Sequence, residues 1–122
     1  MTSGQNKHRP DPRRGEVWLV DFPNRPDDPH LPRPAVVISN DRHNEFSPTV
    51  IVVPIFNDAD FKRLLPSHIP LAKGTAGLIK DSRVLCEHLA SVDKNRLVGV
   101  ALGKIPSTTL TGIVQGIKKA VE

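Results

Sequence analysis

The chain has 122 residues, of which 38% are hydrophobic and 25% charged, and a formal net charge of +4. This length and composition are typical of one globular domain and exclude a disordered chain. No apolar run reaches the roughly 18 residues that cross a bilayer, and the amino terminus has no apolar signal segment. The sequence therefore predicts a cytoplasmic protein with no membrane partner. The single cysteine, Cys86, excludes an internal disulfide and a cysteine-rich zinc site.

The positive charge is concentrated at the amino terminus. Up to residue 14 the basic residues are Lys7, Arg9, Arg13 and Arg14, against one acid, Asp11. Residues 1–13 also lack apolar periodicity and hold two prolines, which predicts a flexible basic tail followed by one domain over 14–122. Such a tail is either solvated or holds polyanions at low salt.

Short segments rich in β-branched and apolar residues follow in chain order and predict strands. They cover residues 14–22, 34–39, 49–55, 67–71, 84–92 and 98–105. A proline-rich loop separates the first two, and Asn40 is placed to cap a short helical turn. Apolar residues at helical spacing predict a helix from residue 107 to the end of the chain. The expected fold is mainly β with a C-terminal helix, as a small, partly open barrel.

Several kinds of chemistry are excluded by the motifs that are missing. The sequence has no glycine-rich phosphate loop, no dinucleotide-binding fingerprint and no G-x-S-x-G. The five histidines show no metal-ligand spacing, so we expect no metal and no cofactor. What remains is a set of polar residues at strand ends, of which Arg33, just before a buried strand, is the most informative. Taken alone, Arg33 is also compatible with a solvated arginine at a strand edge.

Five blocks of sequence carry a resemblance to a known family. They are RGEVWLVDF at 14–22, RPAVVISND at 33–41, SPTVIVVPI at 47–55, PSHIPL at 66–71 and DSRVLCEH at 81–88. In this order they resemble the MazF/PemK (Kid) family of toxin–antitoxin ribonucleases over nearly all of residues 13–122. The resemblance implies an SH3-like barrel of the plasmid-maintenance toxin type, a homodimer, and an antitoxin protein whose tail blocks the RNA groove. It also implies metal-independent cleavage of single-stranded RNA at short sequence motifs.

In that chemistry the ribose 2′-hydroxyl attacks the adjacent phosphorus and leaves a cyclic phosphate and a 5′-hydroxyl. The site must accept a proton, stabilise charge on the phosphoryl oxygens and assist the leaving oxygen. Residue by residue, Arg33 matches the family's arginine, and its planar fork suits charge stabilisation. Glu87 matches the carboxylate proposed as the base in some members, or is an exposed ion-pair partner. Asp28 matches a glutamate that precedes the arginine, or is a solvated loop acid.

The chain also departs from the family at several positions. Phe56 stands where many relatives have a hydroxyl, and is either a base-stacking ring or a core residue. Leu85 replaces an arginine that some members use, and His88 replaces a common glutamine. In a regular strand Glu87 and His88 would point to opposite faces, so that only one could line the groove. His30 is a second candidate for the missing acid, or is solvated.

The sequence therefore predicts an mRNA-cleaving toxin with Arg33, Glu87 and His88 as catalytic residues and Asp28, His30 and Phe56 as substrate-binding residues. Two rivals stay open at this point. One is a toxin of the same fold that poisons gyrase, and the other is a catalytically inactive barrel that binds RNA or protein.

Overall fold

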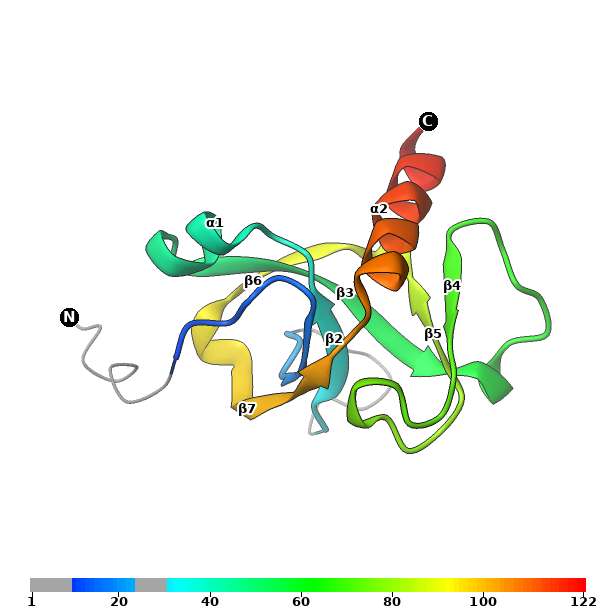
Figure 1. The fold of residues 1–122 in the computed structure, drawn as a ribbon, viewed down its shortest axis with the longest axis horizontal. Helices are drawn as coiled ribbons and strands as arrows, with labels where there is room; N and C mark the ends of the chain where they lie inside the picture. The colour runs from blue at the N-terminus through cyan, green and yellow to red at the C-terminus, as the bar shows by residue number, and fades with distance from the viewer. Residues whose placement is uncertain (1–9, 24–30) are drawn as a thin grey trace.

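The structure, a computed structural model, describes residues 10–23 and 31–122, which form a strongly bent antiparallel sheet and two α-helices (Figure 1). The strands are β1 Glu16–Val20, β2 Arg33–Val37, β3 Thr49–Asn57, β4 His68–Leu71, β5 Ser82–Leu85, β6 Ala90–Asp93 and β7 Leu97–Lys104. The helices are α1 Asp41–Phe46 and α2 Ser107–Val121, with short 3₁₀ turns at η2 Asp58–Asp60, η3 Thr75–Gly77, η4 Cys86–His88 and η5 Lys94–Arg96.

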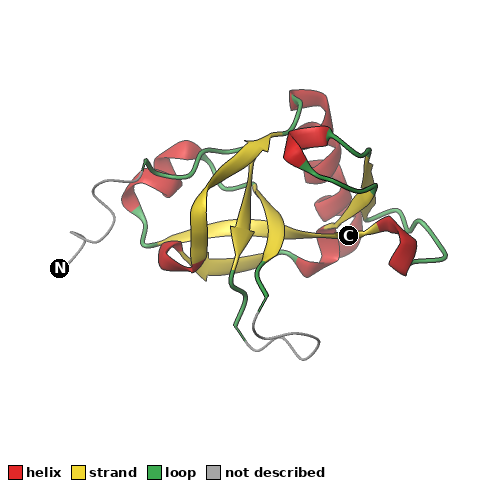
Figure 2. Ribbon diagram, turned by 90° about the horizontal axis from the view of Figure 1, so that it is seen from below, coloured by secondary structure: helices red, strands yellow, loops and turns green. Residues whose placement is uncertain are grey.

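The long strand β3 organises the sheet. The strand order is β4-β5-β3-β2-β1-β7, and β6 pairs with β3 outside this path. The first half of β3 pairs with β6 and its last three residues pair with β5, so the strand takes part in two differently directed parts of the sheet. The sheet curls without joining its end strands among the described residues (Figure 2). The predicted fold, mainly β with a C-terminal helix, is confirmed.

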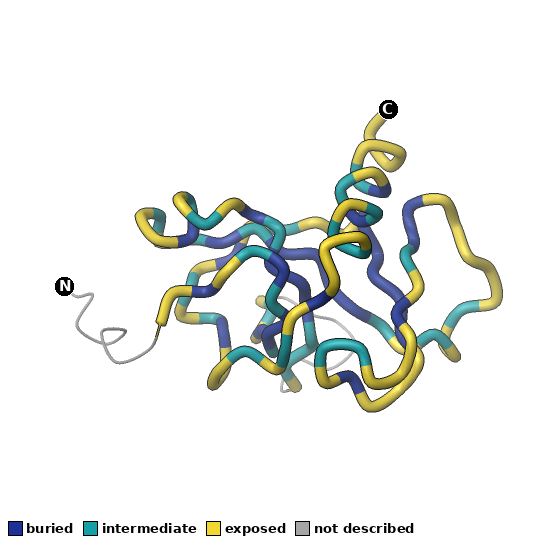
Figure 3. Tube along the Cα trace, in the orientation of Figure 1, coloured by how far each residue is buried: buried dark blue, intermediate teal, exposed yellow. Residues whose placement is uncertain are grey.

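Two apolar clusters fill the interior, one on each side of the bent sheet. The first includes Val36, Val53, Val84 and Ile113, and the second is built around Trp18. The buried segments follow the strands through the centre of the molecule, whereas the carboxyl end of α2 is exposed (Figure 3). Alternate residues of β1 and β2 enter different clusters, so both faces of the sheet are covered here. This explains why nearly every residue of these two strands is apolar.

Helix α2 packs closely against η4 through a glycine. A Cβ atom added at Gly116 would lie 2.8 Å from Cys86 Sγ and 3.4 Å from Ile69 Cδ1. One turn earlier, Gly112 has nothing within 4 Å of the corresponding position. Of the two glycines in this helix, only Gly116 is therefore required by close packing, and it sets how near α2 comes to the turn at Cys86–His88.

The predicted strand over 84–92 is wrong in its middle. β5 ends at Leu85, the 3₁₀ turn η4 follows, and β6 starts at Ala90. The first amide of the turn, that of Cys86, donates to the carbonyl of Ser67 at 3.0 Å and so continues the β4–β5 register by one pair. The chain then turns, with the amide of Leu89 donating to the carbonyl of Cys86 at 3.3 Å, and packs against α2 at Gly116. One apolar segment therefore supplies two short strands.

The amino-terminal boundary of the domain stays a prediction. Residues 1–9 lie outside the described part of the chain, and residues 10–13 have no regular structure. Arg13 nevertheless pairs with Asp41 at 2.9 Å, and Asp11 pairs with Lys94 at 3.2 Å. In the described ranges no helix has the length and apolar content of a membrane-spanning segment.

The contrast between the two glycines gives the first prediction. Gly112→Ala should stabilise the fold by up to about 1 kcal/mol, because alanine is the better helix former and nothing blocks its methyl group. Gly116→Ala should instead destabilise it by about 1–2 kcal/mol, since the overlap with Cys86 and Ile69 outweighs the same gain. Urea unfolding midpoints of the two variants measure this directly. Equal shifts in the same direction would contradict the close packing of α2.

Candidate functional site

The site begins where β2 starts and β3 ends. Antiparallel pairing of the two strands, with Ala35 opposite Pro54, brings these ends together. The guanidinium of Arg33 lies over the ring of Phe56, with its Cζ 4.0 Å from the ring centroid. Its Nη1 also donates to the carbonyl oxygen of Ile55 at 3.3 Å. The ring of Phe56 and the carbonyl oxygen of Ile55 together hold the orientation of the Arg33 guanidinium.

Phe56 belongs to a group of aromatic rings rather than to the core. It is half-buried, and its ring centroid lies 6.0 Å from that of Phe61 in an edge-to-face arrangement and 6.1 Å from that of His88. The ring of Phe61 in turn lies 5.7 Å from that of His68, with the guanidinium of Arg83 4.9 Å from its centroid. The rings of Phe56 and Phe61 therefore lie between two guanidinium groups, that of Arg33 and that of the buried Arg83, and each cation is attracted to the ring beside it.

The carboxylate of Glu87 is held by two donors. Ser67 Oγ donates to its Oε1 at 2.8 Å, and His68 Nε2 lies 2.8 Å from its Oε2. His68 is almost fully buried, whereas a third of the Glu87 side chain, 34%, is exposed. On its other side His68 Nδ1 faces Arg83, which forms an ion pair with Asp58 at 2.7 Å. The buried side chains of Arg83 and His68 thus form a connected series that ends at the partly exposed carboxylate of Glu87.

Glu87 and His88 line the same hollow, contrary to the expectation that only one could. The expectation assumed a regular strand, in which neighbours point to opposite faces, but both residues lie in the turn η4. The hollow has a volume of about 450 Å³. Its lining residues are Phe61, Lys62, Arg63, Leu65, His68, Leu85, Glu87 and His88. One carboxylate, two imidazoles and two cationic side chains therefore line this hollow together with three apolar side chains.

The hydrogen bonds decide the protonation state of Glu87. Burial tends to raise the pKa of its carboxyl group, but hydrogen bonds from its own backbone amide, from His68 and from Ser67 together hold the pKa below the ordinary 4.5. Glu87 is therefore a carboxylate at neutral pH. It can accept a proton or a hydrogen bond, and it cannot act as an acid there.

Cys86, next to this carboxylate in the sequence, is buried. Its side chain is 2% exposed, and its Sγ contacts the carbonyl oxygen of Ile113 in α2 at 3.6 Å. Burial, with a smaller effect from the charge of Glu87, raises the pKa of Cys86 to about 11. The thiol stays protonated at neutral pH, which excludes it as a nucleophile.

The structure brings together four of the residues that the sequence singled out: Arg33, Phe56, Glu87 and His88. The other two, Asp28 and His30, lie outside the described residues. Phe61, His68 and Arg83 also belong to the site, although no motif in the sequence pointed to them. His68 and Arg83 stand inside the blocks PSHIPL and DSRVLCEH, so a polar residue within each apolar strand was the available signal.

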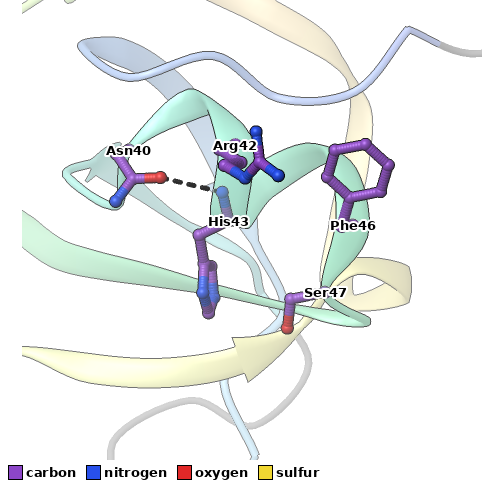
Figure 4. Close-up of a pocket in the computed structure, with 5 residues that line it drawn as sticks. All are labelled: Asn40, Arg42, His43, Phe46 and Ser47. Atoms are coloured by element: carbon purple, nitrogen blue, oxygen red, sulfur yellow. Dashed lines mark hydrogen bonds between the residues drawn. The ribbon is translucent and has the colours of Figure 1, made fainter.

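A second hollow, of similar volume, lies on helix α1 (Figure 4). It is lined by Asn40, Arg42, His43, Phe46 and Ser47. Asn40 Oδ1 accepts a hydrogen bond from the amide of His43 at 2.8 Å, which confirms the predicted helix cap. The Arg42 guanidinium lies 5.7 Å from the Phe46 ring, which is 73% exposed. This second hollow is formed by one short helix and the residues at its two ends, and no carboxylate lines it.

Known proteins resemble this chain in sequence. Residues 13–121 match the family model described as "PemK-like, MazF-like toxin of type II toxin-antitoxin system". Two curated relatives named "Endoribonuclease MazF", from Staphylococcus saprophyticus and Staphylococcus epidermidis, are each 42% identical over 86 residues, which are 70% of this chain and 71% of the relative.

Solved structures share the fold at low sequence identity. An endoribonuclease from a mycobacterial species, in complex with its cognate antitoxin, has a TM-score of 0.72 at 20% identity and covers 90% of this chain and 94% of its own. A MazF from Deinococcus radiodurans has a TM-score of 0.73 at 19% identity, with 90% of this chain and 96% of that chain covered.

The lowered pKa of Glu87 predicts a pH-dependent contribution to stability. A carboxyl whose pKa is depressed in the folded state stabilises the fold above its ordinary pKa, near 4.5, and loses this contribution as the pH falls through the lower folded value. Glu87→Gln should therefore lower the free energy of unfolding at pH 7, by less than about 1 kcal/mol because the group is partly exposed.

The measurement is urea unfolding of parent and variant between pH 7 and pH 3. We expect the difference between them to shrink below pH 4.5. Glu45→Gln, at an exposed position of α1, is the matched control. A difference between parent and Glu87→Gln that grows as the pH falls would contradict the hydrogen-bonded carboxylate.

Proposed function

The chain belongs to the PemK-like, MazF-like toxin family of type II toxin–antitoxin systems, and from that premise we propose that it is an endoribonuclease. It cleaves single-stranded mRNA at a short sequence motif, needs no metal or cofactor, and thereby inhibits translation and growth. The observation that carries the proposal is that the Phe56 ring contacts the Arg33 guanidinium, whose Cζ lies 4.0 Å from the ring centroid, and lies 6.1 Å from the ring of His88. Glu87 and His88 follow each other in η4 and line the same hollow.

Each of these groups has one task in the reaction. The 2′-oxygen forms a bond to phosphorus while its proton passes to the Glu87 carboxylate. Negative charge on the phosphoryl oxygens is stabilised by the planar fork of Arg33, which stays protonated throughout. The bond from phosphorus to the 5′-oxygen then breaks, and this oxygen takes a proton from the imidazolium form of His88, which becomes neutral imidazole. The products are a 2′,3′-cyclic phosphate and a 5′-hydroxyl.

The low pKa of Glu87 has a benefit and a cost in this role. The carboxylate is ready to accept a proton at any pH well above 4.5, but it is a weaker base than a carboxylate with a raised pKa. The arginine fork compensates, because charge stabilisation is often the largest part of such catalysis.

Aromatic rings supply a surface for the bases next to the cut. Phe61 lines the hollow, whose volume of about 450 Å³ is sufficient for one nucleobase, and Phe56 packs edge to face against Phe61. Stacking on such rings contributes roughly 1–3 kcal/mol per base and tolerates any base. Asp28 and His30, within five residues of Arg33 along the chain, remain candidates for further contacts to RNA.

The proposed partners follow from the family. We expect a homodimer in the cytoplasm, neutralised by a cognate antitoxin whose acidic tail occupies the RNA groove. One neighbour in fold is a mycobacterial endoribonuclease in complex with its antitoxin, and another is a Deinococcus radiodurans MazE–MazF complex. The cationic side chains of Lys62 and Arg63 at the hollow suit either RNA or such a tail.

The gyrase poison and the inactive barrel are less favoured. Both leave the hydrogen-bonded Glu87 and the stacked Arg33 without a task, and the curated relatives at 42% identity are named endoribonucleases. Neither rival predicts a cut RNA strand.

The proposal is tested by incubating the pure protein with single-stranded RNA in excess EDTA. Cleavage should persist and leave 2′,3′-cyclic phosphate and 5′-hydroxyl ends. Arg33→Lys keeps the positive charge but loses the planar fork, so the cleavage rate should fall by on the order of a hundredfold with little change in RNA affinity.

Arg42→Lys is the matched control, since Arg42 also lies over a phenylalanine ring but in the hollow on α1. It should cleave like the parent. Equal effects of the two substitutions, or cleavage that needs an added divalent ion, would reject the mechanism.

A further inference from the structure

A buried arginine lies behind the carboxylate, where it cannot contact RNA. The side chain of Arg83, on β5, is 5% exposed. Its Nε and Nη2 donate to Asp58 Oδ1 at 3.0 and 2.7 Å, and its Nη1 donates to the carbonyl oxygen of Arg63. The same Nη1 lies 3.3 Å from His68 Nδ1. The guanidinium is therefore fixed by an acid and a backbone carbonyl and directed at an imidazole.

This contact decides which nitrogen of His68 carries the proton. A guanidinium donates hydrogen bonds and cannot accept them, so Nδ1 must be the accepting nitrogen of the ring. The proton then lies on Nε2, which faces Glu87 Oε2 at 2.8 Å and donates to it. The opposite tautomer would set two N–H groups against each other and turn a lone pair toward the carboxylate. Both of those contacts are repulsive.

The position of Glu87 follows from this tautomer. With Nε2 as donor to Oε2 and the Ser67 hydroxyl as donor to Oε1, both oxygens are held and the plane of the carboxylate is set. His68 itself is 5% exposed and packs edge-on against Phe61, so the ring has no room to rotate in search of another partner.

We propose that Arg83, anchored by Asp58, is a positioning residue of this site: it fixes His68 in the Nε2–H tautomer and so holds the Glu87 carboxylate toward the hollow. The inference rests on the proposed ribonuclease function for its effect on rate, whereas its effect on His68 is a property of the protein alone. A purely structural role is the weaker account, because a buried ion pair gains little stability over apolar groups of the same size.

The experiment compares the parent with Arg83→Met, which keeps most of the side-chain volume and removes every donor. The ring ¹⁵N signals of His68, in protein labelled at histidine and without RNA, report which nitrogen is protonated. We expect a protonated Nε2 in the parent, and in the variant a mixture of tautomers or the opposite one. The kcat for cleavage should fall roughly tenfold to a hundredfold with KM little changed.

Arg96→Met is the matched control, because Arg96 forms an arginine–aspartate pair with Asp21 at 3.4 Å on the surface of the domain. It should leave the His68 signals and kcat unchanged. Asp58→Asn is the second variant if Arg83→Met does not fold. Asp58 is half exposed, and its loss weakens the anchor of Arg83 without emptying the interior. It should shift the tautomer in the same direction and lower kcat less.

Unchanged His68 signals in the folded variants, or an unchanged kcat despite a changed tautomer, would overturn the positioning role. A parent that cuts no RNA contradicts the proposed function instead. In that case the ¹⁵N signals of parent and variants still decide whether Arg83 sets the tautomer of His68.

Discussion

The buried guanidinium of Arg83 is the interaction on which the geometry of the site depends. A charge removed from water is costly unless its partners satisfy it, so the groups around Arg83 are drawn to fixed places. They come from three parts of the chain: Asp58 in η2, the carbonyl of Arg63 in the following loop, and His68 at the start of β4. The loop between β3 and β4 is thereby tied to β5, and it forms one wall of the hollow that contains Glu87.

The ring of Phe56 occupies the position at which the family resemblance implies a hydroxyl group. Phe56 stands where many members of the family have serine or threonine, and it supports the Arg33 guanidinium by a face-on contact at 4.0 Å rather than by a hydrogen bond. Arg83 repeats the arrangement over Phe61 at 4.9 Å. A cation over a ring contributes about 0.5–2 kcal/mol, comparable to an ordinary hydrogen bond. In the proposed mechanism charge stabilisation therefore stays with Arg33, and proton transfer is assigned to Glu87 and His88 in the turn at Cys86–His88.

Much of the fold could be predicted from the sequence, and the part that could not depends on contacts between distant segments of the chain. The β-branched run in β3 and the helical spacing in α2 are strong signals, and both elements were predicted. The turn η4 contains no glycine or proline, and it forms where the chain packs against a distant element, helix α2 at Gly116. Sequence patterns report such tertiary causes poorly.

The residues of the candidate site also fall into those that could be predicted from the sequence and those that could not. Arg33 and Glu87 were found because family blocks contain them. Arg83 and His68 were missed because each is a single polar residue in an apolar strand, and the partner that explains each lies about twenty residues away, 25 for the Arg83–Asp58 pair and 19 for the His68–Glu87 pair. In the proposed mechanism Arg33, Glu87 and His88 act together on one phosphate. A structure of the protein with a short strand whose sugars lack the 2′-oxygen, and which therefore cannot be cut, tests this. We expect one phosphate on the Arg33 fork and the 2′ carbon of the preceding sugar within about 4.5 Å of a Glu87 oxygen. A strand bound on another face, or a phosphate on Arg33 with every sugar turned away from Glu87, would contradict it.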